Sequence, residues 1–390
     1  MANLSAALNI EDLRLLAKKR LTKGLFEFCD RGSEDDVALR HNRDALERIK
    51  LRSRVLNDTS GRHTRSTLFG KPVDMPIAIG PTGPAGFVWY RGETALAQAA
   101  AKAGIPFTVA STSNTPMEKI VENGGGGRLW YHLYVWRDME ASLKAVARAE
   151  AAGFEALVLT VDSTIPYNRE FDYRNGTTMP VRINPRTIKD LATHPRWLFG
   201  TVGRYLMSDG HLPRYVNIDM PEGLSSTGVR DFLFKNDTLD WEFLKRIRDM
   251  WPRTLIVKGV LHADDAVKCA EHGVDGVVIS NHGGIASDAA LAPIDVLPSV
   301  VRAVGDRMTV IVDSGFRRGS DILKGLALGA DAVIVGRATL YGVSAAGEPG
   351  ATRALEILQT ELRRTMGVLA LTDLADITRD YVVLPHELPL

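Results

Sequence analysis

Short runs of apolar and β-branched residues recur along the chain and alternate with amphipathic stretches of helical period. Their near-continuous Val, Ile and Leu content is typical of strands that are buried on both faces, as parallel strands are. The alternation of such runs with helices predicts parallel βα units rather than a β-sandwich. Eight runs are predicted as strands: residues 76–80, 107–110, 129–135, 156–162, 254–259, 276–281, 309–313 and 332–336.

The stretches between these runs read as amphipathic helices, several of which are followed by a glycine suited to ending a helix. Five helices are predicted, at residues 93–103, 139–152, 263–272, 294–304 and 320–328. Eight strands with intervening helices predict a (β/α)₈ TIM barrel that occupies residues 1–390 as a single domain. A doubly wound open sheet is the alternative, because the sequence does not reveal strand order.

Two segments fall outside the repeat. Residues 1–75 are predicted to form an N-terminal helical cap. Residues 163–250 form a long insertion after the fourth strand, and loops of that length in a compact domain are usually lids or binding elements. We therefore expect the insertion to cover an active site.

Composition narrows the choice of partner. The formal net charge is +1 and no long run of like charges occurs. A small-molecule substrate is therefore expected, and a nucleic-acid partner is not. The two cysteines, Cys29 and Cys269, are far apart and lack CxxC spacing, which predicts buried thiols and no metal site.

The chain contains no stretch of about 18 uncharged apolar residues, which favours a cytoplasmic protein. In residues 185–225, aromatic and aliphatic side chains are interleaved with arginines. This pattern suits either a lid or a peripheral contact with the inner face of a membrane. The lid is the favoured interpretation.

Barrel enzymes place their working groups at the carboxyl ends of the strands. Reading those positions in order gives a polar residue at most strand ends. The candidates are Thr82, Ser111, Tyr134, Asp162, Lys258, His282, Asp313 with Arg317, and Gly336 with Arg337. Their coincidence on one face is stronger evidence than any single member, since a lone polar residue at a strand end is often a turn residue.

The last two strands are followed by a phosphate-binding pattern. The stretch DSGFRRG, residues 313–319, offers glycine N–H groups and guanidinium donors ahead of a helix, and Gly336 with Arg337 repeats this one strand later. Barrels commonly bind a cofactor phosphate after strands seven and eight, and arginine suits a phosphate dianion. No GxGxxG or GxxxxGK[ST] motif is present.

Asp162, Lys258 and His282 form a candidate acid–base set. Histidine is the natural base near neutral pH, and a carboxylate beside it would orient the ring and stabilise its charged form. A lysine at a strand end could stabilise developing negative charge. Taken alone, Lys258 would equally suit an aldolase that works through a Schiff base.

Together these motifs resemble the family of FMN-dependent α-hydroxy acid oxidases and dehydrogenases, and most of all its (S)-mandelate dehydrogenase branch. The likeness extends over nearly the whole chain. It is carried by HNRDAL, PIAIGPTG, LTVD, VKG, SNHGG, DSGFRRGSDILKGLALGADAV and VGRATLYG. The combination of SNHGG with DSGFRRG at barrel spacing is specific to this family.

The resemblance implies FMN as cofactor and oxidation of a C–OH or C–NH₂ group next to a carbonyl. It implies His282 as base with Asp162 as its partner, Lys258 beside the flavin, and Tyr134 and Arg169 at the substrate. The implied flavin contacts are Pro81, Thr82, Gly83, Ser111, His132, Thr160, Lys258, Asp313, Gly315, Arg317, Gly336 and Arg337. It also implies a homotetramer and an electron acceptor such as O₂ or a quinone.

Several positions depart from the family pattern. Where relatives read SNHGGRQLD, with an arginine that clamps the substrate carboxylate, this chain reads SNHGGIASD, with Ile285. The tyrosine that shares the clamp is expected at Phe26. His132 replaces a glutamine, Ala110 a serine, and the glycine at Gly83 is typical of dehydrogenases rather than oxidases.

Two interpretations of the missing clamp stay open. In one, Arg169 alone binds the carboxylate. In the other, the substrate has no free carboxylate and is an amide, ester, lactam or larger natural-product intermediate. Two further alternatives remain: a flavin-binding barrel without activity, and a Schiff-base aldolase. The presence of His282, Asp162 and Lys258 disfavours the barrel without activity.

Overall fold

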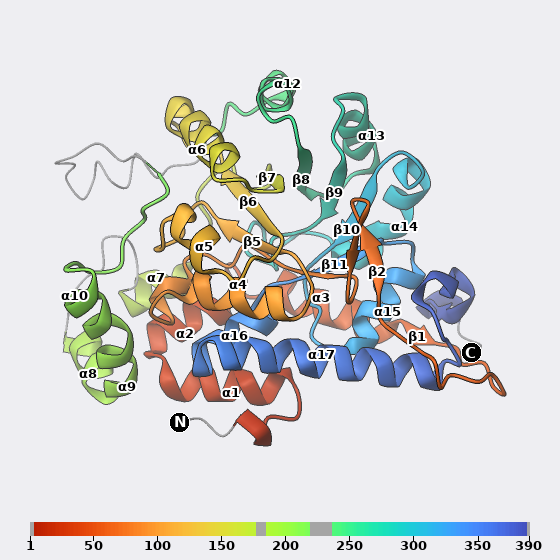
Figure 1. Cartoon of the computed structure of the whole chain (residues 1–390), viewed down its shortest axis with the longest axis horizontal. Coiled ribbons are helices and arrows are strands. Elements are labelled where there is room, and N and C mark those ends of the chain that lie inside the picture. The colour runs from red at the N-terminus through yellow and green to blue at the C-terminus, as the bar shows by residue number, and fades with distance from the viewer. Residues whose placement is uncertain (1–3, 177–184, 219–235, 388–390) are drawn as a thin grey trace.

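The computed structural model describes residues 4–176, 185–218 and 236–387. Within them, eight parallel strands, most of them labelled in Figure 1, follow one another in chain order. They close into a barrel because β11 pairs back onto β4. The predicted TIM barrel is confirmed, and each strand lies inside or within one residue of its predicted run. The strands are β4 (Ile77–Ile79), β5 (Phe107–Ala110), β6 (Leu129–Tyr134), β7 (Ala156–Thr160), β8 (Thr254–Val260), β9 (Gly276–Ile279), β10 (Thr309–Val312) and β11 (Ala332–Val335).

Helices follow the strands and surround the barrel. The five predicted helices agree with the structure to within one residue at each end. The set is α4 (Gly92–Lys102), α5 (Met117–Asn123), α6 (Met139–Ala151), α12 (Trp241–Met250), α13 (Ala263–Glu271), α14 (Pro293–Val304), α15 (Gly319–Ala327), α16 (Arg337–Ala346) and α17 (Glu348–Val368). The long α17 lies beside α16, which also packs on α1 (Ile10–Arg20) (Figure 1).

The two-residue period of the strands sorts their side chains between two cores. Outward-facing members such as Ile77, Leu157 and Val277 join the large cluster under the helices. The inward-facing members form a separate cluster that fills the barrel: Ala78, Trp130, Ala156, Val158, Ile256, Val278, Ile311, Ala332 and Ile334. Because successive side chains of a strand alternate between faces, the next inward positions toward the carboxyl end carry the polar residues discussed below.

The predicted helical cap over residues 1–75 is correct only for its first part. The helices are α1, α2 (Lys23–Asp30) and α3 (Val37–Arg48), but residues 50–75 contain strands. β2 (Ser66–Leu68) and β3 (Lys71–Val73) form a hairpin whose Phe69 packs edge-on against Trp130, 5.8 Å between ring centroids. The hairpin thus plugs the amino end of the barrel, a role that needs an apolar tip and not a helix. β1 (Lys50–Leu51) pairs antiparallel with β12 (Val382–Val383).

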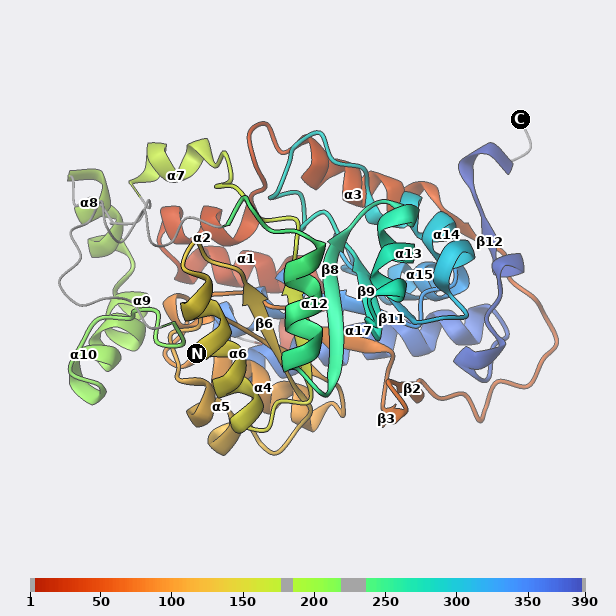
Figure 2. The same ribbon diagram turned by 90° about the horizontal axis from the view of Figure 1, so that it is seen from above.

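The insertion after β7 projects from the barrel as a group of short helices, seen from two directions in Figures 1 and 2. They are α7 (Glu170–Asn175), α8 (Pro185–Thr193), α9 (Pro195–Trp197), a π-helical turn (Leu198–Gly203) and α10 (Arg204–Ser208). Residues 177–184 and 219–235 of the predicted insertion lie outside the described residues, as does the end of the predicted 185–225 surface segment.

Two side chains tie these helices to the rest of the chain. Arg20 donates to the carbonyls of Val88 (2.6 Å) and Ser344 (3.1 Å) and to the hydroxyl of Thr201 (2.9 Å). The indole N–H of Trp197 donates to a carbonyl of the barrel loop. Burial lowers the pKa of Arg20 to about 10. The insertion is therefore anchored on the cap and on the loop after β4, with its far end directed outward.

Candidate active site

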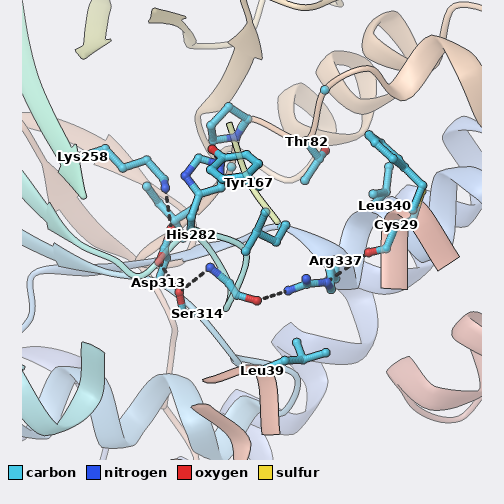
Figure 3. Close-up of a pocket in the computed structure, with 18 of the residues that line it drawn as sticks. Cys29, Leu39, Thr82, Tyr167, Lys258, His282, Asp313, Ser314, Arg337 and Leu340 are labelled. Atoms are coloured by element: carbon cyan, nitrogen blue, oxygen red, sulfur yellow. Dashed lines mark hydrogen bonds and ion pairs between the residues drawn. The ribbon is translucent and has the colours of Figure 1, made fainter. Parts of the chain in front are cut away.

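A cavity of about 350 Å³ opens at the carboxyl end of the barrel. Its walls come from the loops after β4, β7, β9, β10 and β11 and from the cap. Figure 3 shows Lys258, His282, Tyr167 and Asp313 on one side of it and Arg337 with Cys29 on the other. The predicted site residues that line it are Pro81, Thr82, Gly83, Tyr134, Arg169, Lys258, His282, Ile285, Asp313, Gly315, Arg317, Gly336 and Arg337.

His282 is presented by a strained turn. Its φ is +58°, a left-handed conformation that is rare for a residue with a Cβ, and Gly283 and Gly284 follow at +66° and +77°. A Cβ on Gly283 would lie 2.5 Å from an Arg337 nitrogen, and one on Gly284 would lie 2.6 Å from the Leu39 backbone. The glycines of SNHGG therefore let this turn pass between the arginine and the cap, which fixes the imidazole over the cavity.

The imidazole Nδ1 of His282 lies 3.1 Å from Oδ1 of Asp162. Burial of Asp162 raises its pKa, but the charges of His282 and Lys258 and hydrogen bonds from His282 and Ser163 lower it more, so the net pKa is well below its usual range. Asp162 is thus an ionised acceptor for Nδ1–H. This arrangement leaves Nε2 of a neutral ring with its lone pair toward the cavity, as a general base requires.

Two phenols lie on the Nε2 side of the ring. The hydroxyl of Tyr134 lies 2.9 Å from Nε2, and that of Tyr167 lies 3.5 Å away. Burial raises the pKa of both tyrosines above the ordinary value, so both stay neutral. Tyr134 was predicted from the sequence to lie here, whereas Tyr167 was not.

Lys258 occupies an inward position two residues beyond Ile256. Its ammonium donates to Ser280 Oγ at 2.9 Å and lies 3.4 Å from Oδ2 of Asp313. A Schiff-base lysine needs its amine free to attack a carbonyl carbon. The hydrogen bond to Ser280 and the ion pair with Asp313 therefore disfavour the aldolase alternative.

The opposite side of the cavity is cationic. Arg337 donates to the backbone carbonyls of Cys29, Gly283 and Arg31 at 2.8–3.0 Å, and burial lowers its pKa. Arg317 reaches the Tyr341 hydroxyl at 3.4 Å. Within the described residues neither guanidinium has a carboxylate within salt-bridge distance. Two half-buried cations on the cavity wall without a carboxylate in reach predict that an anionic group binds between them.

The structure corrects the position of one substrate contact. Phe26 is 4% exposed and faces Arg14 and Lys18 of the cap, away from the cavity. Phe28 lines the cavity instead. Two residues along a helix are turned by about 200°, so only one of the two phenylalanines of FEF can face the barrel. The sequence did not reveal which face α2 presents.

Three predicted flavin contacts do not line the cavity. Ser111 is fully buried and accepts from the backbone N–H of Tyr134 at 3.4 Å. His132 and Thr160 are inward residues of neighbouring strands, with 2.7 Å between Nε2 and Oγ1. These two form a polar layer between the apolar barrel core and the strand ends, because they lie two residues beyond Trp130 and Val158.

At the substrate end the clamp is absent, as the sequence indicated. Ile285 lines the wall, and its carbonyl accepts from Ser33. Arg169 also lines the cavity, but its guanidinium donates to the Phe28 carbonyl at 2.6 Å and lies 3.0 Å from Asp172. Its charge is therefore already balanced by a carboxylate of α7, the helix that begins directly after it.

Comparison with known proteins matches residues 17–384 to the model of the FMN-dependent dehydrogenase family. The chain belongs to this family. It is 39% identical over 376 residues to (S)-mandelate dehydrogenase of Pseudomonas putida, a match that covers 96% of this chain and 93% of the relative. FMN is accordingly its cofactor, and it is an FMN-dependent α-hydroxy acid dehydrogenase or oxidase by family.

Solved structures agree with this membership. A crystal structure described as monotopic membrane protein (S)-mandelate dehydrogenase superposes with a TM-score of 0.90 at 38% identity, over 97% of this chain and 99% of that one. A mandelate oxidase variant in which an arginine is replaced by leucine, solved with 2-hydroxy-phenylacetamide, superposes with a TM-score of 0.76 at 32% identity, over 95% and 96%.

The residues present fit FMN. The guanidiniums of Arg317 and Arg337, which have no carboxylate within salt-bridge distance in the described part of the chain, suit its phosphate. The hydroxyl of Thr82, which lines the cavity, is buried and has no hydrogen-bond partner among the described residues, so it is available to the flavin ring. A Cβ on Gly83 would lie 2.4 Å from Thr112 Oγ1. The loop after β4 therefore has no room for a side chain at this position of the cavity wall.

Sequence reasoning missed several cavity residues. Tyr167 lies in the loop after β7, and Tyr215 comes from the insertion, where Val216 N–H donates to Ser113 at 3.3 Å and Asn217 accepts from Met117 at 2.8 Å. Tyr167 could have been suspected from its place just beyond a strand end. Tyr215 had no such signal, because only the return of the insertion onto the barrel brings it to the cavity.

Proposed function

We propose that this enzyme oxidises a secondary hydroxyl, or an amine, next to a neutral carbonyl such as an amide, ester or lactam. The observation that supports this most is that Ile285 and Phe28 line the cavity, and that the guanidinium of Arg169, which also lines it, is already paired with Asp172. An ionised carboxylate placed there would lose its hydration without gaining a partner. The amide ligand of the mandelate oxidase variant, which lacks one arginine, is consistent with this interpretation.

In the proposed mechanism the substrate binds in the cavity with its hydroxyl-bearing carbon beside His282. Nε2 of His282 takes one substrate proton, while Asp162 holds Nδ1–H and stabilises the resulting positive charge. Tyr134 donates to the substrate oxygen once substrate displaces its 2.9 Å contact with Nε2. When bound, FMN would accept the two electrons and the second hydrogen that leave the substrate. Lys258 would contact its ring, and Arg317 with Arg337 would hold its phosphate.

Most of the proposed roles are assigned to residues that line the cavity. We assign catalysis to His282, Asp162, Tyr134 and Lys258, and substrate contact to Tyr134, Phe28, Arg169, Ile285 and His282. We assign flavin contacts to Pro81, Thr82, Gly83, Lys258, Asp313, Gly315, Arg317, Gly336 and Arg337. His132 and Thr160 would support the flavin from the layer beneath it.

The test uses a matched pair of compounds, (S)-mandelate and (S)-mandelamide, which differ only in the charge of the group beside the hydroxyl. Purified holoenzyme is mixed anaerobically with each, and flavin bleaching is followed. We expect the amide to reduce the flavin with a kcat/KM at least about tenfold higher than the acid, since a charge-assisted contact is missing. A preference for mandelate would overturn the neutral-carbonyl assignment and leave Arg169 as the anchor.

We further propose that the insertion binds a membrane surface peripherally. Phe199, Leu206 and Met207 expose 69%, 50% and 79% of their area, beside Arg196 and Arg204. Exposed apolar side chains flanked by cations favour an interfacial position on anionic lipid. Among the described residues no helix is long and apolar enough to cross a bilayer. We propose that this contact is with the inner face of the membrane, and that the electron acceptor is a quinone, as the glycine at Gly83 suggests for a dehydrogenase.

The assembly proposed from the family resemblance is a homotetramer, which sedimentation of the detergent-free holoenzyme would test. A dimer or monomer at micromolar concentration would contradict it.

A further inference from the structure

We propose that Asn42, on helix α3 of the cap, is a positioning residue for His282. It would act through Asn281, the residue that begins the turn in which His282 stands. This inference rests on the proposed role of His282 as base, and it adds a residue of the cap to the groups on which that role depends.

The turn that carries His282 runs from Asn281 to Gly284. The N–H of Gly284 closes it by donating to the backbone carbonyl of Asn281 at 3.1 Å. The two central residues, His282 and Gly283, have φ values of +58° and +66°. Turns with positive φ at both central positions are dominated by glycine, asparagine and aspartate, so a histidine there is strained. The turn therefore needs support from its surroundings to keep the imidazole in place.

The side chain of Asn281 supplies part of that support. Its Oδ1 accepts from the N–H of Gly284 at 3.0 Å, and its Nδ2 donates to the carbonyl of Leu291 at 3.1 Å. These two backbone partners fix which end of the amide is the oxygen, because a backbone N–H can only donate and a carbonyl can only accept. The amide of Asn281 thus closes the turn a second time, beside the backbone bond.

Asn42 holds this amide in place. Its Nδ2 donates to Asn281 Oδ1 at 3.0 Å, and Asn281 Nδ2 donates to Asn42 Oδ1 at 2.7 Å. Because the backbone fixes the orientation of Asn281, the orientation of Asn42 follows from it. Both residues are only 1% exposed, so bulk water would not replace either bond if it were lost.

Loss of the Asn42 amide would therefore act on the base from outside the site. Asn42 contacts the residue directly before His282, whose Nδ1 lies 3.1 Å from Asp162 Oδ1. A turn that relaxed from its left-handed conformation would carry the imidazole away from that carboxylate. Asn42 itself does not line the cavity, so its replacement should leave the substrate and flavin contacts in place.

The experiment compares holoenzymes of the parent, Asn42→Ala, Asn42→Leu, Asn281→Ala and the double variant Asn42→Ala with Asn281→Ala. Leucine branches at the same carbon as asparagine, so Asn42→Leu fills the space and removes the hydrogen bonds. The matched control is Asn236→Ala, which removes another buried amide, one that accepts from Thr238. Anaerobic flavin reduction is followed with (S)-mandelamide or (S)-mandelate, whichever reduces the parent faster, and is expressed per bound flavin.

We expect both Asn42 variants to lower the limiting rate of flavin reduction about 10- to 100-fold, because a displaced base reacts more slowly. The dissociation constants of substrate and FMN should stay nearly unchanged. The double variant should be no slower than Asn281→Ala, since Asn42 acts through Asn281. A crystal structure of Asn42→Ala should show His282 displaced from Asp162, a readout that needs no substrate.

The inference fails if the Asn42 variants lose no more rate than Asn236→Ala, or if the losses of Asn42→Ala and Asn281→Ala add in the double variant. An unchanged contact between His282 and Asp162 in the Asn42→Ala crystal would also overturn it. None of these outcomes would touch the proposed base. A His282→Ala variant that still reduced its flavin at the parent rate would instead overturn that assignment.

Discussion

Oδ1 of Asp162 lies 3.1 Å from Nδ1 of His282, on the side of the ring away from the two cavity tyrosines. This contact fixes both the orientation of the imidazole and the nitrogen that carries its hydrogen. The two residues follow different strands, β7 and β9, separated by β8. The barrel closure that brings these strand ends together therefore also builds the base.

The first prediction separates the base from its partner. His282→Ala should abolish substrate-driven flavin reduction while FMN stays bound, since the imidazole contacts no phosphate-binding group. Asp162→Asn should lower kcat by about two orders of magnitude, because the ring keeps its place but loses stabilisation of its charge. Stopped-flow reduction and the flavin-to-protein absorbance ratio measure the two effects. Equal losses in both variants would argue against distinct roles.

The second prediction concerns pH and stability. The pKa of Asp162 is held below its usual range in the folded protein, so the ionised carboxylate contributes stability that is fully present above the unfolded pKa of about 3.9. That contribution is lost as pH falls from about 4 toward the folded pKa. The difference in unfolding free energy between the parent and Asp162→Asn should thus be constant from pH 5 to 6 and shrink below pH 4. Urea unfolding at each pH would measure it, and a difference that grew toward acid would contradict the assignment.

The third prediction tests the phosphate site. Arg317→Gln should weaken FMN binding about 10- to 100-fold, the effect of removing one charge-assisted contact, with little change in the stability of the flavin-free protein. Arg337→Gln should weaken FMN binding and also lower Tm without FMN, because three backbone carbonyls of the cap and of the β9 turn lose their donor. Fluorescence titration and thermal unfolding distinguish the two variants.

The fourth prediction concerns the missing clamp. Phe28→Tyr with Ile285→Arg should raise kcat/KM for mandelate about tenfold or more, since both side chains would enter the cavity. Phe26→Tyr with Ile285→Arg is the matched control and should gain less, because position 26 faces Arg14 and Lys18. Similar gains from both pairs would mean that α2 does not present Phe28 to the substrate.

The fifth prediction concerns the membrane surface. Replacing Phe199, Leu206 and Met207 by serine should release the protein from anionic vesicles in a sedimentation assay and leave flavin reduction by soluble substrate intact. The control is Val55→Ser with Leu56→Ser, which removes strongly exposed apolar side chains elsewhere on the chain. If only the control variant lost vesicle binding, the membrane contact would lie at Val55 and Leu56 and not on the insertion.

The sequence by itself was enough to predict the barrel and most of its catalytic end. Each strand appears in the sequence as a continuous apolar run, so the end of the run marks the carboxyl end of the strand. Because the strands are parallel, these carboxyl ends lie at the same end of the barrel. For this reason the sequence alone groups His282, Asp162, Lys258 and the two arginines at one end of the barrel. The hairpin between residues 66 and 73 was missed because its short strands, with Pro72 inside one of them, give little periodic signal.

The tertiary structure decided which side chains meet across elements. The choice between Phe26 and Phe28 depends on the face that α2 turns to the barrel, and local sequence does not encode that rotation when both candidates are phenylalanine. Tyr167 and Tyr215 reach the cavity only because an insertion folds back onto the strand ends. The period of apolar residues shows which face of one helix or strand is buried. It does not show which other element covers that face, because that depends on interactions along the whole chain.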